Sequence, residues 1–381
     1  MTNKRLRVGI LFGGRSGEHE VSLQSAASLL AAIDRRKYDV VPVGITKQGR
    51  WMVGPALKAG GPDFLAGVLV HGEPVTVSAA PLGPRLVPLN SVAHARTELP
   101  PTIDVVFPLL HGTFGEDGTV QGLLELAGIP YVGAGVLASS VGMDKDVMKR
   151  LFRDARLPVV DWVAFLRKEW QSNPAHLRRL VERRIGYPAF VKPANLGSSV
   201  GISKVTCTRD LACALNLAAR YDRKILVEKG VNAREIECAV LGNDEPQASV
   251  SGEIEPVNEF YDYEAKYVRE GSRLLIPAPL PNKTARLVQR LALAAFKAIE
   301  CSGMARVDFL LDRKTGELFV NEINTIPGFT SISMYPKLWE ASGLSYPKLI
   351  DRLIQLALAR HREQKHTLYT YAARPPAAAK R

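Results

Sequence analysis

Cysteine is scarce in this 381-residue sequence, and the four that occur do not have the spacing of a metal site. None of Cys207, Cys213, Cys238 and Cys301 forms a CxxC pair, which argues against a disulfide framework or a zinc cluster. Small buried cysteines in a reducing compartment are the simpler interpretation.

Long apolar runs are also missing. No segment approaches the roughly 20 apolar residues that a membrane-spanning helix needs. The N-terminal apolar run, Val8–Phe12, is too short for a signal peptide, and no small-residue cleavage site follows it. We therefore expect a cytoplasmic protein without a membrane partner, divided by its length into two or three domains.

Acidic residues are in deficit, with 38 Asp and Glu against 50 Lys and Arg and a net charge of +12. Residues 360–381 carry six basic residues and one acidic residue, a net charge of +5, and we expect 363–381 to be a disordered basic tail. The remaining charge suits polyphosphate binding, or weak nucleic-acid binding. Aromatic residues do not alternate with the basic ones as a stacking surface requires, so we expect no nucleic-acid partner.

The N-terminal third has the pattern of a parallel sheet. A strand at Arg7–Phe12, an amphipathic helix at Ser22–Ile33 and a strand at Tyr38–Ile45 form a βαβ unit. Residues 54–100 are rich in Gly and Pro, and we expect them to be irregular or β-rich. A strand at Asp104–Leu110 and a helix at Gly118–Ala127 resume the pattern.

Beyond residue 141 the pattern changes to α+β. A basic helix is predicted at Lys145–Ala155, and a second helix at Thr284–Glu300, where Leu287, Leu291, Ala294 and Ala298 have helical spacing. Between them, we expect strands that alternate with hairpins, at Ala189–Lys192, Ile202–Val205, Ile225–Glu228 and Glu235–Leu241. We expect an α/β fold with domains at 1–140, 141–231 and 232–362.

An acidic hairpin near the C-terminus is the most informative segment. Strands at Met304–Leu311 and Leu318–Asn324 flank a short Gly-containing turn, which predicts an antiparallel hairpin. Alternation places Arg306 and Asp308 on one face of the first strand, and Glu322 and Asn324 on one face of the second. Pairing can therefore bring Asp308, Glu322 and Asn324 together beside Arg306.

Two carboxylates and an amide oxygen are hard ligands that suit Mg²⁺ and not zinc. The alternative is a solvated sheet face with cross-strand salt bridges. The apolar surroundings argue against it, because a buried acidic pair without a cation is unfavourable.

A glycine-rich loop follows a strand that carries a lysine. The loop Asn195–Gly201 comes after Lys192 and can fold over phosphates through backbone N–H groups. It is not a Walker A loop, because the lysine precedes the glycines and no helix is predicted after it. A second lysine, Lys145, begins the basic helix. An ordinary hairpin turn and a surface charge are the simpler alternatives for these two features.

The strand Ile225–Gly230 ends in an acid and a base, Glu228 and Lys229. An adenine ring could stack on this strand and hydrogen-bond its terminal backbone. Glu235 lies seven residues beyond Glu228 and could accept hydrogen bonds from ribose hydroxyls. Ordinary charges at the end of a strand are the alternative.

With these residues assembled, the chain closely resembles the D-alanine–D-alanine ligases of the ATP-grasp superfamily. Six blocks match in family order: Gly13–Leu23, His111–Gly118, Met143–Lys145, Val191–Gly201, Phe260–Tyr267 and Asn321–Ser331. The resemblance runs from about residue 7 to 350. It implies an N-terminal substrate domain followed by two α+β ATP-grasp subdomains, with a mobile lid at about 252–277.

The resemblance also implies roles for individual residues around the two D-alanine molecules. Glu18 matches the residue that holds the first ammonium group, in a triad with Ser198 and Tyr267. Arg306 matches the arginine near the acyl phosphate, and Gly328 offers a backbone N–H to the tetrahedral oxyanion. The remaining substrate-binding positions are Val21, His111, Lys266, Ser333 and Met334, with Lys266 approaching the γ-phosphate. A structural, hydrogen-bonded histidine is the alternative for His111.

For the nucleotide, the resemblance implies that Lys145 and Lys192 bind phosphates. Further ATP-binding positions are Ser199, Glu228, Lys229, Val231 and Glu235. The metal ligands are Asp308, Glu322 and Asn324, which would hold Mg²⁺ or Mn²⁺, with two ions expected.

The implied reaction joins two D-alanine molecules through a D-alanyl phosphate at the expense of ATP, supplying peptidoglycan precursors. Tyr267 is the family's mark of D-alanine as the second substrate, and a D-lactate-using depsipeptide ligase is the closest alternative. A non-catalytic nucleotide-binding regulator is a further one, against which the complete set of acidic-hairpin residues argues. The family is typically dimeric, so we expect a homodimer.

Overall fold

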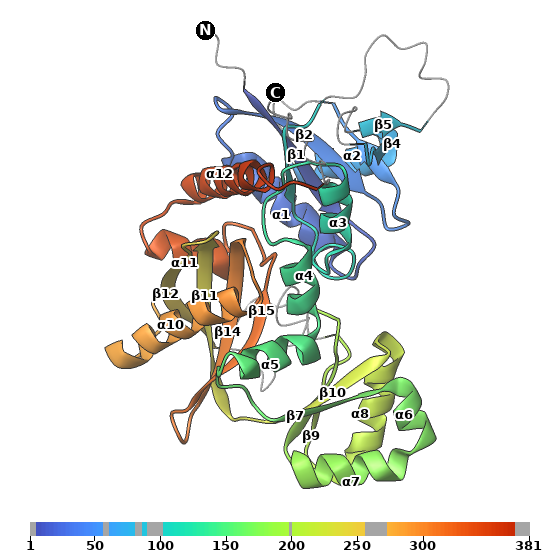
Figure 1. Cartoon of the computed structure of the whole chain (residues 1–381), viewed down its shortest axis with the longest axis vertical. Helices are drawn as coiled ribbons and strands as arrows, with labels where there is room; N and C mark the ends of the chain where they lie inside the picture. Colours follow the sequence, from blue (N-terminus) through green and yellow to red (C-terminus); the bar gives the residue numbers. More distant parts are fainter. Residues whose placement is uncertain are drawn as a thin grey trace, which may run out of the picture.

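The computed structural model describes residues 5–55, 61–80, 86–89, 102–197, 200–255 and 273–369. It consists of three lobes, each built on its own β-sheet (Figure 1). Each lobe contains both helices and strands, which confirms the predicted α/β class. Among the helices in these ranges, none has the length and apolarity needed to cross a membrane.

The N-terminal lobe contains the predicted parallel strands. Strand β1 (Leu6–Gly13) pairs in parallel with β2 (Tyr38–Ile45) and with β6 (Val105–Pro108). Helix α1 (His19–Ala32) joins β1 to β2 and covers one face of the sheet. Both faces of β1 are buried, which explains why its sequence is a continuous apolar run.

The complete sheet has the strand order β5-β4-β3-β2-β1-β6. Its second half, from β2 to β5, is antiparallel. The added strands are β3 (Trp51–Val53), β4 (Glu73–Val77) and β5 (Leu86–Pro88). The expectation of an irregular or β-rich 54–100 segment was incomplete, because it also contains helix α2 (Pro62–His71). Proline at its first position suits a helix start, and Leu65 and Val68 share its buried face.

Helices α3 (Thr119–Leu126) and α4 (Val136–Met143) lead out of the N-terminal lobe to α5 (Lys145–Asp154), as Figure 1 shows. Met148 and Phe152 of α5 pack with apolar residues of the C-terminal sheet and of helix α10 (Asn282–Ala298). The sequence analysis assigned α5 to the central subdomain at 141–231. In the structure, α5 shares an apolar core with the C-terminal sheet.

The central lobe has a four-stranded antiparallel sheet in the order β7-β10-β8-β9. Its strands are β7 (Trp162–Leu166), β8 (Ala189–Pro193), β9 (Ser203–Val205) and β10 (Lys224–Lys229). Three helices pack against one face of the sheet, namely α6 (Arg167–Ser172), α7 (Pro174–Arg184) and α8 (Thr208–Tyr221). The predicted strands form here, and β8 pairs with β9 as an antiparallel hairpin, but the sequence analysis missed the helices that lie between β7 and β8 and between β9 and β10.

The C-terminal lobe has a five-stranded antiparallel sheet in the order β13-β12-β11-β14-β15. Its strands are β11 (Ala233–Gly242), β12 (Gln247–Glu255), β13 (Arg273–Leu275), β14 (Gly303–Asp312) and β15 (Leu318–Asn324). Helix α10 covers one face, and its buried residues Val288, Ala292 and Ala295 lie one position after the predicted Leu287, Leu291 and Ala294, with Phe296 buried as well.

The N-terminal and C-terminal lobes share one apolar core. Helix α11 (Met334–Ala341) and the long helix α12 (Tyr346–Gln364) contribute to it together with β1 and α1. Arg360 of α12 donates hydrogen bonds to the carbonyl oxygens of Gly133 and Tyr131, and its guanidinium lies 4.5 Å from the centre of the Tyr131 ring. The C-terminal helix therefore joins the two lobes that are most distant in sequence.

Two predicted segments extend beyond the described residues. The ends of the expected lid form strands β12 and β13, which pair through Glu255 and Arg273, while residues 256–272 lie outside the description. Helix α12 extends to Gln364, so the first two residues of the expected tail are helical. Residues 370–381 lie outside the described ranges.

Candidate functional site

The acidic hairpin forms with the predicted pairing. Strands β14 and β15 are antiparallel, with Asp308 opposite Glu322 and Arg306 opposite Asn324. A register shift directly after Asp308 leaves both pairs aligned. The amide Nδ2 of Asn324 donates to Asp308 Oδ2 at 2.9 Å. All four side chains named in the sequence analysis are thus gathered on one patch of the sheet.

Arg306 is held by acidic residues on two strands. Its Nε and one terminal nitrogen donate to the two oxygens of Asp308, each at 2.7 Å, a bidentate pair. Nε also lies 3.0 Å from Glu237 on β11. Burial alone would lower the pKa of Arg306, but Asp308 and Glu237 raise it well above its usual value. Arg306 is therefore a fixed positive charge.

Glu237 was missed by sequence reasoning. It lies on β11 opposite Asp308, so Glu237, Asp308 and Glu322 form a row across three adjacent strands. Its side chain is 7% exposed. The available signal was the Glu235–Glu237 alternation, but only the pairing of β11 with β14 shows that Glu237 reaches the acidic patch.

The donor set of this patch fits a hard divalent cation. Three carboxylates face one guanidinium, so the row carries excess negative charge, and all of its donors are oxygens. Within the described ranges, no group of three or more His, Cys, Asp or Glu side chains is arranged to hold a metal ion. If Asp308, Glu322 and the Asn324 amide bound one ion, its remaining coordination positions would be left for phosphate oxygens. This is the arrangement typical of Mg²⁺ bound with a nucleotide.

A second cluster of charges lies at the far end of β10. Glu228 is buried, and its two carboxylate oxygens contact two different lysines. Lys192 of β8 contacts Oε1, and Lys149 of α5 lies 3.2 Å from Oε2. Burial would raise the pKa of Glu228, but the two lysines lower it to about 2. Glu228 is therefore an ionised carboxylate that is buried away from solvent.

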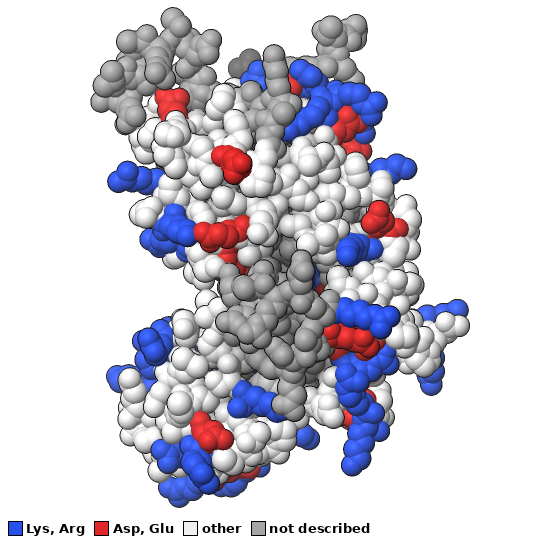
Figure 2. Space-filling model, turned by 180° about the vertical axis from the view of Figure 1, so that it is seen from behind, with Lys and Arg blue, Asp and Glu red and all other residues white. Residues whose placement is uncertain are grey.

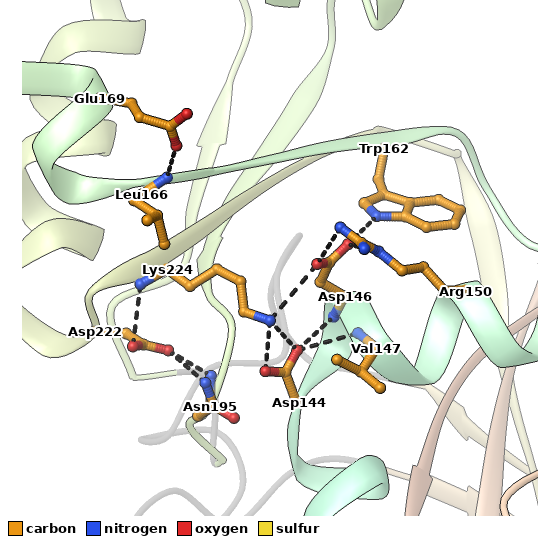
Figure 3. A network of polar contacts seen from close by, with 10 residues as sticks. All are labelled: Asp144, Asp146, Val147, Arg150, Trp162, Leu166, Glu169, Asn195, Asp222 and Lys224. Atoms are coloured by element: carbon orange, nitrogen blue, oxygen red, sulfur yellow. Dashed lines mark hydrogen bonds and ion pairs between the residues drawn. The ribbon is translucent and has the colours of Figure 1, made fainter.

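The glycine-rich segment is fixed to α5 by a polar network (Figure 3). Asn195, at its start, donates through its backbone and side-chain nitrogens to Asp222, at 2.8 and 2.9 Å. Lys224 of β10 donates its backbone N–H to Asp222 and its ammonium to Asp144. Asp144 in turn caps α5 by accepting from two backbone N–H groups of the first helical turn.

Lys145 connects the same loop to the helix directly. Its backbone N–H donates to the carbonyl oxygen of Ala194 at 3.0 Å, and its ammonium donates to that of Leu196 at 2.6 Å. The side chain is largely buried, so the alternative of a free surface charge was wrong for this residue. Lys145 and Lys192 thus both lie at the stem of the glycine-rich loop.

The other three positions expected to bind the nucleotide follow Glu228 in the sequence. Lys229 ends β10 with an exposed side chain, and Val231 is partly exposed in the connection to β11. Glu235 on β11 is partly buried. Glu235 interacts electrostatically with Lys192, the lysine that contacts Glu228, so it lies near this cluster of charges.

Glu18 lies where the N-terminal lobe meets the glycine-rich loop. It is the residue before α1, and its backbone N–H donates to Ser16 Oγ. A Cβ placed on Gly112 would lie 2.6 Å from Glu18 Oε2, and one on Gly197 would lie 3.1 Å from it. Glycine at both positions therefore lets two loops approach this carboxylate.

His111 is buried and fully engaged. Its Nδ1 lies 3.1 Å from the carbonyl oxygen of Ile326 and its Nε2 lies 3.0 Å from Ser25 Oγ. Since a carbonyl oxygen only accepts, the proton is on Nδ1 and Nε2 accepts from the serine. Burial lowers the pKa of His111 in spite of the nearby Glu18, so the ring is neutral. These contacts support the structural alternative for His111.

Glu116 is a further residue that sequence reasoning left without a role, although it lies inside the His111–Gly118 block. Its Oε1 accepts from the backbone N–H of Gly112 at 2.9 Å. Burial raises the pKa of Glu116 to about 8, and the charge of Glu18 acts in the same direction. The signal was an acid among apolar and glycine residues, but its environment could be seen only in the fold.

Residues after β15 surround the opposite side of the site. A Cβ on Gly328 would lie 3.2 Å from Ser333 Oγ, and that hydroxyl also contacts the backbone N–H and hydroxyl of Thr330. Met334 begins α11, and its side chain is buried in the shared core, which leaves its backbone N–H as the group available at the helix start. Val21 is buried in α1.

Four expected site residues lie outside the described ranges, and their positions stay predictions: Ser198, Ser199, Lys266 and Tyr267.

Comparison with known proteins identifies the family. Residues 7–134 match the family model described as the D-ala D-ala ligase N-terminus, and residues 151–355 match that of the D-ala D-ala ligase C-terminus. The chain belongs to the D-alanine–D-alanine ligase family. It is similar to a D-alanine–D-alanine ligase of Heliobacterium modesticaldum, with 52% identity over 94% of this chain and 96% of that protein.

Solved structures agree with this assignment. A D-alanine–D-alanine ligase from Coxiella burnetii superimposes with a TM-score of 0.81 at 39% identity, covering 95% of this chain and 96% of the other. A D-Ala:D-Ser ligase from Enterococcus faecalis gives the same TM-score at 37% identity, covering 93% and 100%. Members of the D-alanine–D-alanine ligase family are ATP-dependent enzymes that act on small molecules with a divalent metal.

Charged side chains of both signs are spread over the surface of this D-alanine–D-alanine ligase homologue (Figure 2). On the face shown in Figure 2, the basic side chains of the described residues stand in separate groups with uncharged areas between them.

Proposed function

We propose that this chain joins two D-alanine molecules into D-alanyl-D-alanine at the expense of ATP, for peptidoglycan precursor synthesis. The observation that carries the proposal is the strand register that sets Asp308 opposite Glu322 and Arg306 opposite Asn324. This register brings oxygen donors that would suit a divalent cation next to a fixed positive charge, which supports phosphoryl transfer to a carboxylate.

In the first step, a carboxylate oxygen of one D-alanine attacks the γ-phosphorus of ATP, and ADP leaves. Lys145 and Lys192 hold the phosphates from the stem of the glycine-rich loop, and Glu228, with Lys229, Val231 and Glu235, holds the nucleoside. Glu18 binds the ammonium group of the D-alanine, in a triad with Ser198 and Tyr267, beside Val21 and His111. This orientation keeps the reacting carboxylate in line with the phosphate.

Asp308, Glu322 and Asn324 would hold the divalent ion, which would supply charge neutralisation on the phosphates when bound. Arg306 adds a fixed positive charge near the transferred phosphoryl group, because its contacts with Asp308 and Glu237 keep it protonated and oriented. Lys266, on the lid, contributes a further positive charge on closure, and closure excludes water from the reactive acyl phosphate.

In the second step, the amine of the other D-alanine attacks the carbonyl carbon, and phosphate leaves. The backbone N–H of Gly328 stabilises the tetrahedral oxyanion. Ser333 and the backbone N–H of Met334, at the start of α11, hold the carboxylate of this second D-alanine, since a helix N-terminus favours an anion. The contact of Ser333 with the Gly328 position supports this arrangement.

The test is phosphate release from ATP in the presence of D-alanine or L-alanine, with the product identified by mass. The proposal predicts release with D-alanine alone and formation of the dipeptide. The same assay with D-lactate or D-serine added to D-alanine, near neutral pH, distinguishes a D-alanine–D-alanine ligase from ligases that use another acceptor. Predominant formation of D-alanyl-D-lactate or D-alanyl-D-serine would reject D-alanine as the acceptor, and ATP binding without turnover would identify a regulator.

The family resemblance also leads us to infer two divalent ions per site, a homodimer, action in the cytoplasm and three domains at 1–140, 141–231 and 232–362. Metal titration with a bound ATP analogue measures the number of divalent ions per site. Light scattering after gel filtration measures the mass of the assembly, with one chain of 41.6 kDa as the monomer value.

A further inference from the structure

Lys149 is a buried cation that the proposed reaction leaves without a role. It follows Lys145 by four residues and so lies one turn further along the same face of α5. Its side chain is 1% exposed, which is rare for a lysine. Its ammonium lies 3.2 Å from Glu228 Oε2 and 5.9 Å from the centre of the Trp162 ring.

The two lysines on Glu228 differ in their freedom to move. Lys192 has 12% of its side chain exposed and is the penultimate residue of β8, the strand that leads into the glycine-rich loop. Lys149 is enclosed on all sides in the middle of α5, whose start is fixed by Asp144 and Lys224. Lys192 can therefore turn toward a ligand at the loop, whereas Lys149 stays beside Glu228.

Nucleotide phosphates compete with Glu228 for Lys192. In the structure Lys192 contacts Glu228 Oε1, whereas the proposed function needs its ammonium on the phosphates. Without a second cation, the transfer would leave a buried carboxylate unpaired, which is strongly unfavourable. Lys149 contacts the other oxygen, Oε2, so the carboxylate remains paired when Lys192 moves.

We propose that Lys149 is a permanent counter-ion of Glu228 that allows Lys192 to leave Glu228 and bind the phosphates of the nucleotide. Lys149 is thus a positioning residue, since it acts through Glu228 and Lys192. This inference rests on the proposed phosphate-binding role of Lys192.

The test compares two ligands that differ in phosphate. Binding of the non-hydrolysable analogue AMPPNP with Mg²⁺, and of adenosine, is measured by calorimetry for wild type and Lys149→Met. Only AMPPNP requires Lys192 to move, so we expect its affinity to fall at least tenfold, or about 1.4 kcal/mol, and that of adenosine less than threefold. Equal losses for both ligands would indicate a merely structural role and overturn the proposal, as would unchanged AMPPNP affinity.

Arg153→Met is the matched control. Arg153 lies one turn further along α5, is exposed and contacts the same Trp162 ring at 4.9 Å, so the variant removes an equal charge without affecting Glu228. We expect it to bind both ligands like wild type. A loss of AMPPNP affinity as large as that of Lys149→Met would show a general charge effect and reject the role of Lys149.

A second pair of variants covers the case in which Lys149→Met does not fold. In Glu228→Gln there is no carboxylate to neutralise, so adding Lys149→Met should change AMPPNP affinity less than threefold. A further tenfold loss would overturn the proposal. Wild type provides the separate check on the proposed function: if it forms D-alanyl-D-alanine while Lys149→Met binds AMPPNP normally, only this inference fails.

Discussion

Replacing Glu322 by glutamine separates the role of the acidic hairpin in catalysis from its role in folding. Glu322 lies opposite Asp308, in a row of three carboxylates that is completed by Glu237. The substitution keeps the size of the side chain and removes one negative charge. A metal ligand should be lost, whereas the packing of β14 against β15 should remain.

The expected effect on stability is small because opposing charges nearly cancel. Opposite residues in an antiparallel pair have Cβ atoms about 5 Å apart, and two like charges at that separation repel by about 3 kcal/mol at an effective dielectric constant of about 20. Arg306, Lys149 and Lys192 attract Glu322 in the opposite sense. We expect the metal-free free energy of unfolding to change by less than about 1 kcal/mol, and Tm by less than about 4 °C.

The expected effect on turnover is large. We predict a fall of at least 100-fold at low Mg²⁺, or about 2.7 kcal/mol of transition-state stabilisation. The assay is D-alanine-dependent phosphate release over a range of Mg²⁺ concentrations, with thermal unfolding in EDTA measured alongside. Glu317→Gln is the control, because Glu317 lies on the exposed turn of the same hairpin. Near-normal turnover of Glu322→Gln at low Mg²⁺ would refute the reasoning.

Three further predictions concern other parts of the molecule. The folded-state pKa of Glu116, about 8, is above its ordinary value of 4.5, so its contribution to stability is present below pH 4.5 and is lost as the pH rises through 8. Urea unfolding at pH 5.5, 7 and 8.5 should therefore show wild type losing stability relative to Glu116→Gln, and a constant difference would argue against the raised pKa. Arg360→Met removes the hydrogen bonds of α12 to Gly133 and Tyr131 and should lower the free energy of unfolding by about 3 kcal/mol; the exposed Arg352→Met is the control, and equal losses would contradict a specific tie. Tyr267→Phe should loosen acceptor choice, seen as more D-alanyl-D-lactate in mixed-acceptor assays, and unchanged selectivity would rule this out.

The sequence predicted those parts of the fold in which a local pattern decides the structure. The hairpin at 304–324 follows from two alternating strands and a Gly-containing turn, and its pairing brings Asp308, Glu322 and Asn324 together beside Arg306, as expected. The βαβ unit follows from two buried apolar strands around an amphipathic helix. In each case neighbouring residues contain the whole signal.

Elements with a weak local signal were missed. Helix α7 has only two buried residues, Leu177 and Val181, and its remaining surface is dominated by arginine. Helix α2 lies within a segment rich in Gly and Pro, which conceals its short apolar face. Tertiary packing decides the structure of such segments, and local propensity does not.

The missed site residues depend on contacts between distant segments. Glu237 reaches the acidic patch only because β11 pairs with β14, 70 residues further along the chain. In the sequence, Lys149 is one of several charges on a basic helix. Its ion pair with Glu228 forms only because α5 packs beside β10. Burial in the folded chain raises the pKa of Glu116, and Glu18, from another segment of the chain, acts in the same direction. Spacing along the sequence contains none of this information.

The most direct test of the central claim is a titration of Mn²⁺ into the protein with bound AMPPNP, followed by electron paramagnetic resonance. If Asp308 and Glu322 hold the same ion, Asp308→Asn and Glu322→Gln should each weaken Mn²⁺ binding at least tenfold, and Glu317→Gln should leave it unchanged. Binding of Mn²⁺ to both site variants with wild-type affinity would contradict the account.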